Sequence, residues 1–99
     1  MRGLVWNSLI VLALACGVAQ AADPDPVQLA GACQGCHGVT GQGGNGIPTI
    51  VRQQNRAEFV AMMQAFRGNQ RPATVMGRIA RGYTDAEFAA LATHFARPQ

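Results

Sequence analysis

The 99-residue sequence contains no lysine, and only 6% of its residues are aromatic. Its positive charge comes from eight arginines, which are spread along the chain and are not interleaved with aromatic residues. Nucleic-acid-binding domains usually gather basic residues on one face or along one helix, so this distribution disfavours that function. The formal net charge of +3 leaves a mildly basic surface, which either suits an acidic partner or is simply solvated.

The sequence also lacks an apolar run long enough to cross a bilayer. Its longest run covers residues 9–19, eleven positions, whereas a spanning helix needs about 20. Arg2 precedes the run and Ala19-Gln20-Ala21 follows it, which is the order of regions in a secretory signal peptide. We therefore expect a leader over residues 1–21 and export of the remaining chain to the periplasm.

Two alternatives to a cleaved leader are an uncleaved anchor and lipidation at Cys16. The run is short for an anchor, and Ala13-Leu14-Ala15 is a poor lipidation signal. Cleavage after Ala21 leaves one domain over residues 22–99.

Cysteine is scarce in that domain, which retains only Cys33 and Cys36. Exported domains of this size often need disulfides or a bound group to complete a thin core. The two cysteines stand in Cys33-Gln34-Gly35-Cys36-His37, the C-x-x-C-H pattern of covalent c-type haem attachment. On a helix the three side chains converge on one flat group, with His37 placed as an iron ligand.

Two other kinds of site share the C-x-x-C spacing. A redox disulfide usually lies in a βαβ context, whereas this neighbourhood has a helical and glycine-rich pattern. A zinc site needs a second pair of ligands, and His94 is the only other histidine in the chain. We therefore favour haem, one group per chain, over both alternatives.

The sequence predicts three helices with recognisable ends. Asp25 and Pro26 begin the first, whose apolar stripe is Leu29, Ala32, Cys33 and Cys36, and Gly38 ends it. Capping boxes begin the other two: Asn55 with Glu58, and Thr84 with Glu87. Their stripes are Phe59, Met62, Met63 and Phe66 in the second helix, and Phe88, Leu91, Ala92 and Phe95 in the last.

A glycine-rich stretch follows the first helix and includes G-x-G-x-x-G at Gly41, Gly43 and Gly46. A dinucleotide fingerprint needs a preceding strand and a following helix, and the sequence predicts neither. We expect a loop whose bare backbone packs against a flat ring.

Further residues complete the predicted iron site. A backbone carbonyl near Pro48 is the candidate acceptor for the second ring nitrogen of His37, although Pro48 also suits a plain turn. Met76 belongs to no helical stripe, and its thioether is the candidate second axial ligand. Met62 and Met63 are more consistent with core packing. His94 is consistent with a surface position, and its role as a ligand is a weaker alternative.

Together these features resemble the small bacterial class I c-type cytochromes. Residues 38–50, 63–68 and 71–87 are similar to the cytochrome subunits of flavocytochrome c sulfide dehydrogenases. The resemblance implies an all-α fold of about four short helices around one haem, thioether bonds at Cys33 and Cys36, and axial ligation by His37 and Met76. It also implies electron acceptance from a flavoprotein subunit that oxidises sulfide. Some members carry two haem domains, whereas this chain has one attachment motif.

The expected function is therefore one-electron transfer, since the chain offers no nucleophile–base pair for catalysis. Besides the subunit of a sulfide dehydrogenase, a freely diffusing carrier to an oxidase or another acceptor is an alternative. A haem-based ligand sensor or peroxidase is a third possibility, and it requires an open iron coordination position.

Overall fold

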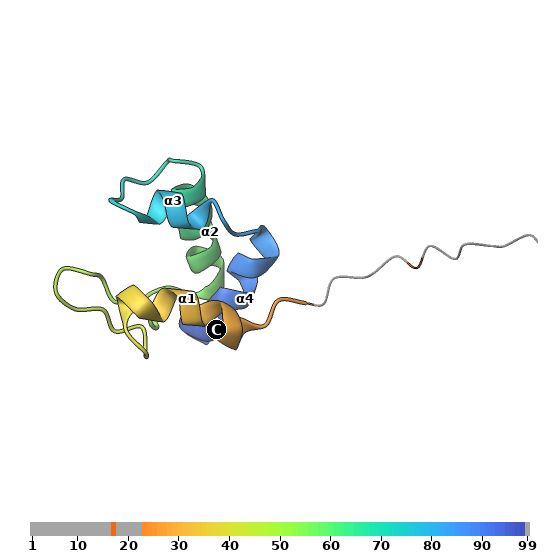
Figure 1. Cartoon of the computed structure of the whole chain (residues 1–99), viewed down its shortest axis with the longest axis horizontal. Helices are drawn as coiled ribbons and strands as arrows, with labels where there is room; N and C mark the ends of the chain where they lie inside the picture. The colour runs from red at the N-terminus through yellow and green to blue at the C-terminus, as the bar shows by residue number, and fades with distance from the viewer. Residues whose placement is uncertain (1–16, 18–22, 99) are drawn as a thin grey trace, which may run out of the picture.

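The computed structural model describes residue 17 and residues 23–98. These residues form four helices, α1 (Pro26–His37), α2 (Arg56–Arg67), α3 (Met76–Ala80) and α4 (Asp85–Phe95) (Figure 1). Across this part of the chain there is no strand, only an isolated bridge between Gly44 and Ile47, so the all-α prediction is confirmed. The predicted leader lies outside the described residues, apart from residue 17. No helix in residues 23–98 has the length and apolar character needed to cross a membrane.

The helix ends follow the local sequence signals. Asp25 caps α1 by accepting a hydrogen bond from the Val27 amide at 3.0 Å, and Pro26 is the first helical residue. Both predicted capping boxes are present, at the starts of α2 and α4. Each cap satisfies amide groups that have no partner within the helix, which is why such short segments have sharp beginnings.

The core lies where α4 packs against both α1 and α2. The predicted stripe of α4 is fully buried, and Phe59 of α2 stacks on Phe95 with ring centroids 6.3 Å apart. The stripe of α2 also faces this core, with Phe59 and Met63 buried and Met62 and Phe66 half-buried. Helix α3 packs on α2, so it is held at the opposite end of the molecule from α1 (Figure 1).

The structure corrects the stripe predicted for α1. Ala32 and Cys36 are exposed, whereas Ala30 and His37 are buried and Cys33 is half-buried. Helical geometry explains the difference, because Cys36 lies roughly 60° around the axis from Cys33. The contact line of α1 with the rest of the protein therefore runs through Ala30, Cys33 and His37.

Helix α3 was not located from the sequence. It has only five residues, begins at Met76 and includes Gly77. A segment of little more than one turn is too short to show a repeating apolar pattern. Its stability comes from packing on α2, with Ala80 fully buried.

Candidate haem-binding site

His37 ends α1 with its side chain inside the protein, 8% exposed. Its Nδ1 lies 2.7 Å from the backbone carbonyl oxygen of Pro48, in the segment where the sequence predicted such an acceptor. A carbonyl oxygen only accepts hydrogen bonds, so Nδ1 carries the proton of this contact, and in the neutral ring the lone pair is then on Nε2. This is the ring state that binds a metal ion through Nε2, with Nδ1 oriented by a backbone group.

The two cysteines differ in their surroundings. Cys33 is half-buried and packs against the core, whereas Cys36 is exposed at the surface of α1. Burial raises the pKa of the Cys33 thiol, because the thiolate would lose hydration. Tyr83 lies close enough to interact with Cys33, and its pKa is raised by burial first and then by this neighbour and Glu87.

The glycine-rich loop folds back onto His37. The Gly43 amide donates a hydrogen bond to the His37 backbone carbonyl at 2.6 Å, while the His37 ring bonds Pro48 farther along the same loop. Gly41 is buried, and a Cβ there would lie 3.1 Å from the ring of Phe95. The sequence predicted that the bare backbone of this loop packs against a flat ring. At Gly41, the flat ring next to the backbone is the phenyl group of Phe95. A helix precedes the loop and no helix follows until Arg56, so the dinucleotide interpretation has no structural support.

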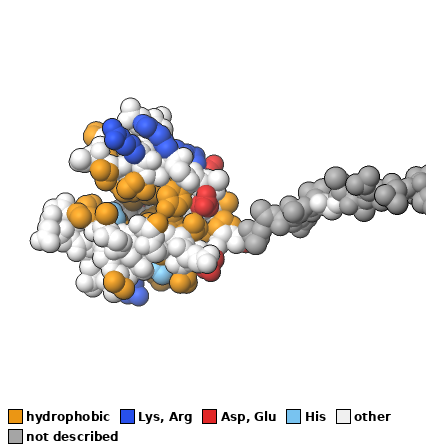
Figure 2. Space-filling view, viewed as in Figure 1, with side chains coloured by type: hydrophobic (Ala, Val, Ile, Leu, Met, Phe, Trp, Pro, Cys, Tyr) orange, Lys and Arg blue, Asp and Glu red, His pale blue; other side chains and the backbone are white. Residues whose placement is uncertain are grey.

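Met76 begins α3 and is half-buried against the same core as Cys33. Helices α1 and α3 do not pack on one another. Helix α1 packs on α4, and α3 packs on α2. Between these two ends of the molecule the surface is hollowed, and hydrophobic side chains gather in the hollow (Figure 2). The structure therefore carries Met76 on α3 and the Cys33–His37 motif on α1, and these two helices of Figure 1 lie on either side of the hollow that Figure 2 shows in the same view.

The weaker candidates occupy other positions. Met63 is buried and Met62 half-buried in the core. His94 is exposed and lies edge-on to Phe95, with centroids 4.7 Å apart. In the described part of the chain, no three His, Cys, Asp or Glu side chains gather as a metal-binding group, so the zinc alternative gains no support.

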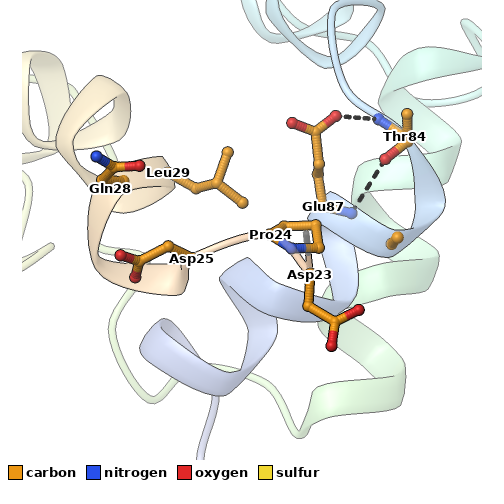
Figure 3. Close-up of a pocket in the computed structure, with 8 residues that line it drawn as sticks. Asp23, Pro24, Asp25, Gln28, Leu29, Thr84 and Glu87 are labelled. Atoms are coloured by element: carbon orange, nitrogen blue, oxygen red, sulfur yellow. Dashed lines mark hydrogen bonds between the residues drawn. The ribbon is translucent and has the colours of Figure 1, made fainter. Parts of the chain in front are cut away.

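A separate groove lies between the first turns of α1 and α4 (Figure 3). Its lining is acidic and includes Asp23, Asp25 and Glu87. Glu87 is occupied by the capping box, where it accepts from the Thr84 amide at 2.9 Å. This groove contains none of the predicted site residues.

The residues at the hollow fit a covalently attached haem. The buried ring of His37 offers Nε2 to a metal ion, while its Nδ1 is hydrogen-bonded to the Pro48 carbonyl. Two thiols precede that ring on the same helix, and a half-buried thioether lies at the start of α3. The contact of Gly43 with the His37 backbone was missed, because the G-x-G-x-x-G pattern in which Gly43 stands does not signal it.

This combination of an all-α fold and a C-x-x-C-H helix resembles the small c-type cytochromes. The sequence is 38% identical over 63 residues to the cytochrome subunit of sulfide dehydrogenase from Chlorobaculum tepidum. The match covers 64% of this chain and 56% of that protein, so the chain spans little more than half the length of its relative. No protein-family model matches the chain. The resemblance to the cytochrome subunit agrees with the one that the sequence motifs suggested.

Proposed function

We propose that the chain is an exported, periplasmic one-electron carrier with a single covalent haem, held by Cys33 and Cys36 and ligated by His37 and Met76. The observation that carries this proposal is the 2.7 Å contact between His37 Nδ1 and the Pro48 carbonyl, directly after the two cysteines. Bound haem supplies an iron that alternates between ferrous and ferric states. A cytochrome subunit among its relatives supports the same class of function.

The protein residues have separate roles in this function. Cys33 and Cys36 would hold the porphyrin through two thioether bonds, each formed by addition of S–H across a vinyl group, with sulfur bonded to one vinyl carbon and the hydrogen to the other. A thioether has no proton to lose, so the hydration cost that raises the Cys33 pKa no longer matters once the bond forms. His37 donates its Nε2 lone pair, and Pro48 fixes the orientation of the ring.

Met76 distinguishes an electron carrier from a ligand sensor. A thioether at the second axial position closes the iron to small molecules and raises the reduction potential. The half-buried position of Met76 against the core favours this role over that of an exposed loop residue. We therefore propose electron transfer in preference to ligand sensing or peroxidase chemistry.

We further propose that the electron donor is the flavoprotein subunit of a sulfide dehydrogenase, and that it docks on the face around α3. This α3 face comprises the exposed residues Arg71, Val75, Arg78, Ile79 and Arg81. Val75 and Ile79 are 53% and 41% exposed, and Figure 2 shows basic side chains gathered at this end of the molecule. Apolar side chains within a basic rim suit an acidic redox partner.

The absorption spectrum of the purified, periplasmically expressed protein tests the proposal. We expect a low-spin haem spectrum in both redox states, a haem mass that survives denaturation, and no carbon monoxide binding to the native ferrous form. Loss of haem on denaturation would contradict covalent attachment, and carbon monoxide binding would favour the sensor alternative. Reduction by sulfide only when the flavoprotein subunit is added would support the proposed donor over a freely diffusing carrier.

A further inference from the structure

We infer that Gly43 is a positioning residue, whose missing side chain lets the Pro48 carbonyl reach His37. The inference rests on the proposed function, because its consequence is felt at the iron that His37 would ligate. Gly43 touches neither the ring of His37 nor a ligand atom in this role. It acts through the carbonyl group that holds the ring.

Gly43 lies against the backbone of both residues that share the hydrogen bond between the His37 ring and Pro48. Its amide donates to the His37 backbone carbonyl at 2.6 Å. A Cβ on Gly43 would lie 2.6 Å from the Pro48 carbonyl carbon and 2.7 Å from its oxygen, and would also overlap the Ile47 carbonyl oxygen. These distances are far inside van der Waals contact, and the Pro48 oxygen is the atom that accepts the proton of Nδ1.

The backbone around Pro48 has little room to yield to an added methyl group. On one side, Ile47 exchanges two hydrogen bonds with Gly44, at 2.9 and 3.0 Å. On the other side, Ile50 and Thr49 donate to the carbonyl of Gly41, at 2.7 and 3.1 Å. A side chain at residue 43 therefore displaces the Pro48 carbonyl or breaks one of these bonds.

Displacement of that carbonyl changes the electronic character of His37. A hydrogen bond from Nδ1–H to a carbonyl makes the imidazole a stronger electron donor through Nε2, which stabilises ferric iron relative to ferrous. A longer or broken bond weakens this donation. Gly43 therefore keeps the reduction potential lower than it would be with any other residue at this position.

The same loop supplies a matched control. Gly46 has φ of +84°, close to the +71° of Gly43, so alanine is disfavoured by the backbone at both positions. A Cβ on Gly46 meets nothing within 4 Å, whereas a Cβ on Gly43 meets the Pro48 carbonyl. The two substitutions share the backbone strain and differ in the contact with Pro48.

The experiment compares the holoproteins of wild type, Gly43→Ala and Gly46→Ala by redox titration and by NMR of the diamagnetic ferrous state. We expect Gly43→Ala to raise the reduction potential and to accelerate solvent exchange of the His37 Nδ1 proton. Gly46→Ala should leave both close to wild type. Equal behaviour of the two variants, with haem attached in both, would overturn the inference while leaving the proposed function intact.

Wild-type protein provides a second test if Gly43→Ala attaches no haem. In the ferrous holoprotein, the Gly43 amide and the His37 Nδ1 proton should both exchange slowly with solvent, because their hydrogen bonds join the same loop to His37. The Gly46 amide, at an exposed glycine of that loop, should exchange faster. Fast exchange of the Gly43 amide, at the rate of Gly46, would contradict the inference. Absence of covalent haem from the wild type would instead refute the proposed function.

Discussion

The guanidinium group of Arg67 pairs with the carboxylate of Asp85, linking the end of α2 to the start of α4. Arg67 also donates to the Tyr83 carbonyl at 3.2 Å, and its Cζ lies 4.9 Å from the ring centroid of Phe88. One side chain thus holds the turn that follows α3. Because Met76 begins α3, this contact also restrains the helix that carries the proposed second ligand.

The Arg67–Asp85 pair makes stability depend on pH in the acid range. Hydrogen bonding to Arg67, with a smaller contribution from Gln64, holds the pKa of Asp85 below its ordinary value of 3.8. A carboxyl group with a lowered folded-state pKa stabilises the protein above its unfolded pKa and loses this effect as the pH falls through the folded pKa. Wild type should therefore be more stable than Asp85→Asn at neutral pH, and the two should converge below pH 3.8.

Urea unfolding followed by circular dichroism at a series of pH values measures this difference. Added salt should narrow it at neutral pH, since both side chains are partly exposed and their attraction is screened. A difference that persists unchanged at pH 2 would show that the asparagine acts through something other than charge.

The capping box of α4 gives a prediction for stability alone. Thr84→Ala removes the hydroxyl that accepts from the Glu87 amide at 3.2 Å, and should cost about 1 kcal/mol of unfolding free energy. Thr93→Ala is the matched control, because the Thr93 hydroxyl bonds a carbonyl within the same helix and caps no free amide. Chemical denaturation of both variants is the measurement, and an equal loss in both would argue against the cap.

The assignment of Met76 predicts a spectroscopic change. Met76→Ala should remove the sulfur-to-ferric-iron charge-transfer band and lower the reduction potential, because the thioether favours ferrous iron. Met62→Ala is the control, since Met62 is a half-buried methionine of α2. If Met62→Ala removes the band and Met76→Ala does not, the ligand assignment is wrong.

The double substitution Cys33→Ala/Cys36→Ala should yield little folded protein. Eight apolar residues are buried in the described part of the chain, a thin core for an independent domain. Far-UV circular dichroism during heating tests this, with Cys16→Ala as a control that should retain haem. A cooperative unfolding transition in the double variant would show that the core is sufficient without haem.

The α3 face predicts how charge affects partner binding. Arg78→Glu should slow association with an acidic redox partner by up to about tenfold at low ionic strength, and the effect should fade as salt is added. Arg56→Glu carries the same charge change at an exposed position outside the α3 face. Stopped-flow reduction by the flavoprotein subunit measures both. Equal slowing would indicate a general effect of net charge.

Local signals predicted the starts of α1, α2 and α4 and the buried stripe of α4. Capping boxes involve residues three positions apart, and the stripe of α4 repeats over most of the helix, so both are visible in the sequence. The stripe of α1 was only partly right. Helix α1 contributes a narrow line to the core, and its sequence does not show on which side α4 lies.

Features that depend on distant contacts were not predictable in the same way. The sequence indicated the Pro48 segment as the acceptor for His37, but only the folded loop shows the 2.7 Å contact. Arg67 and Asp85 are 18 residues apart and belong to different helices, so no local spacing signals their pairing. The role of Gly43 depends on how the loop closes, because glycine alone does not reveal what its missing side chain would meet.

The packing of α1 on α4 has a consequence for the order of assembly. Helices α2 and α3 are consecutive in the chain and can pair early in folding. Helices α1 and α4 are the first and the last of the described helices, so they can pack together only after the segments between them have folded back. The contact line of α1, which includes Cys33, is therefore enclosed last. Until then the Cys33 thiol would be open to the proposed covalent attachment, whereas the Cys36 thiol is exposed in the folded chain as well.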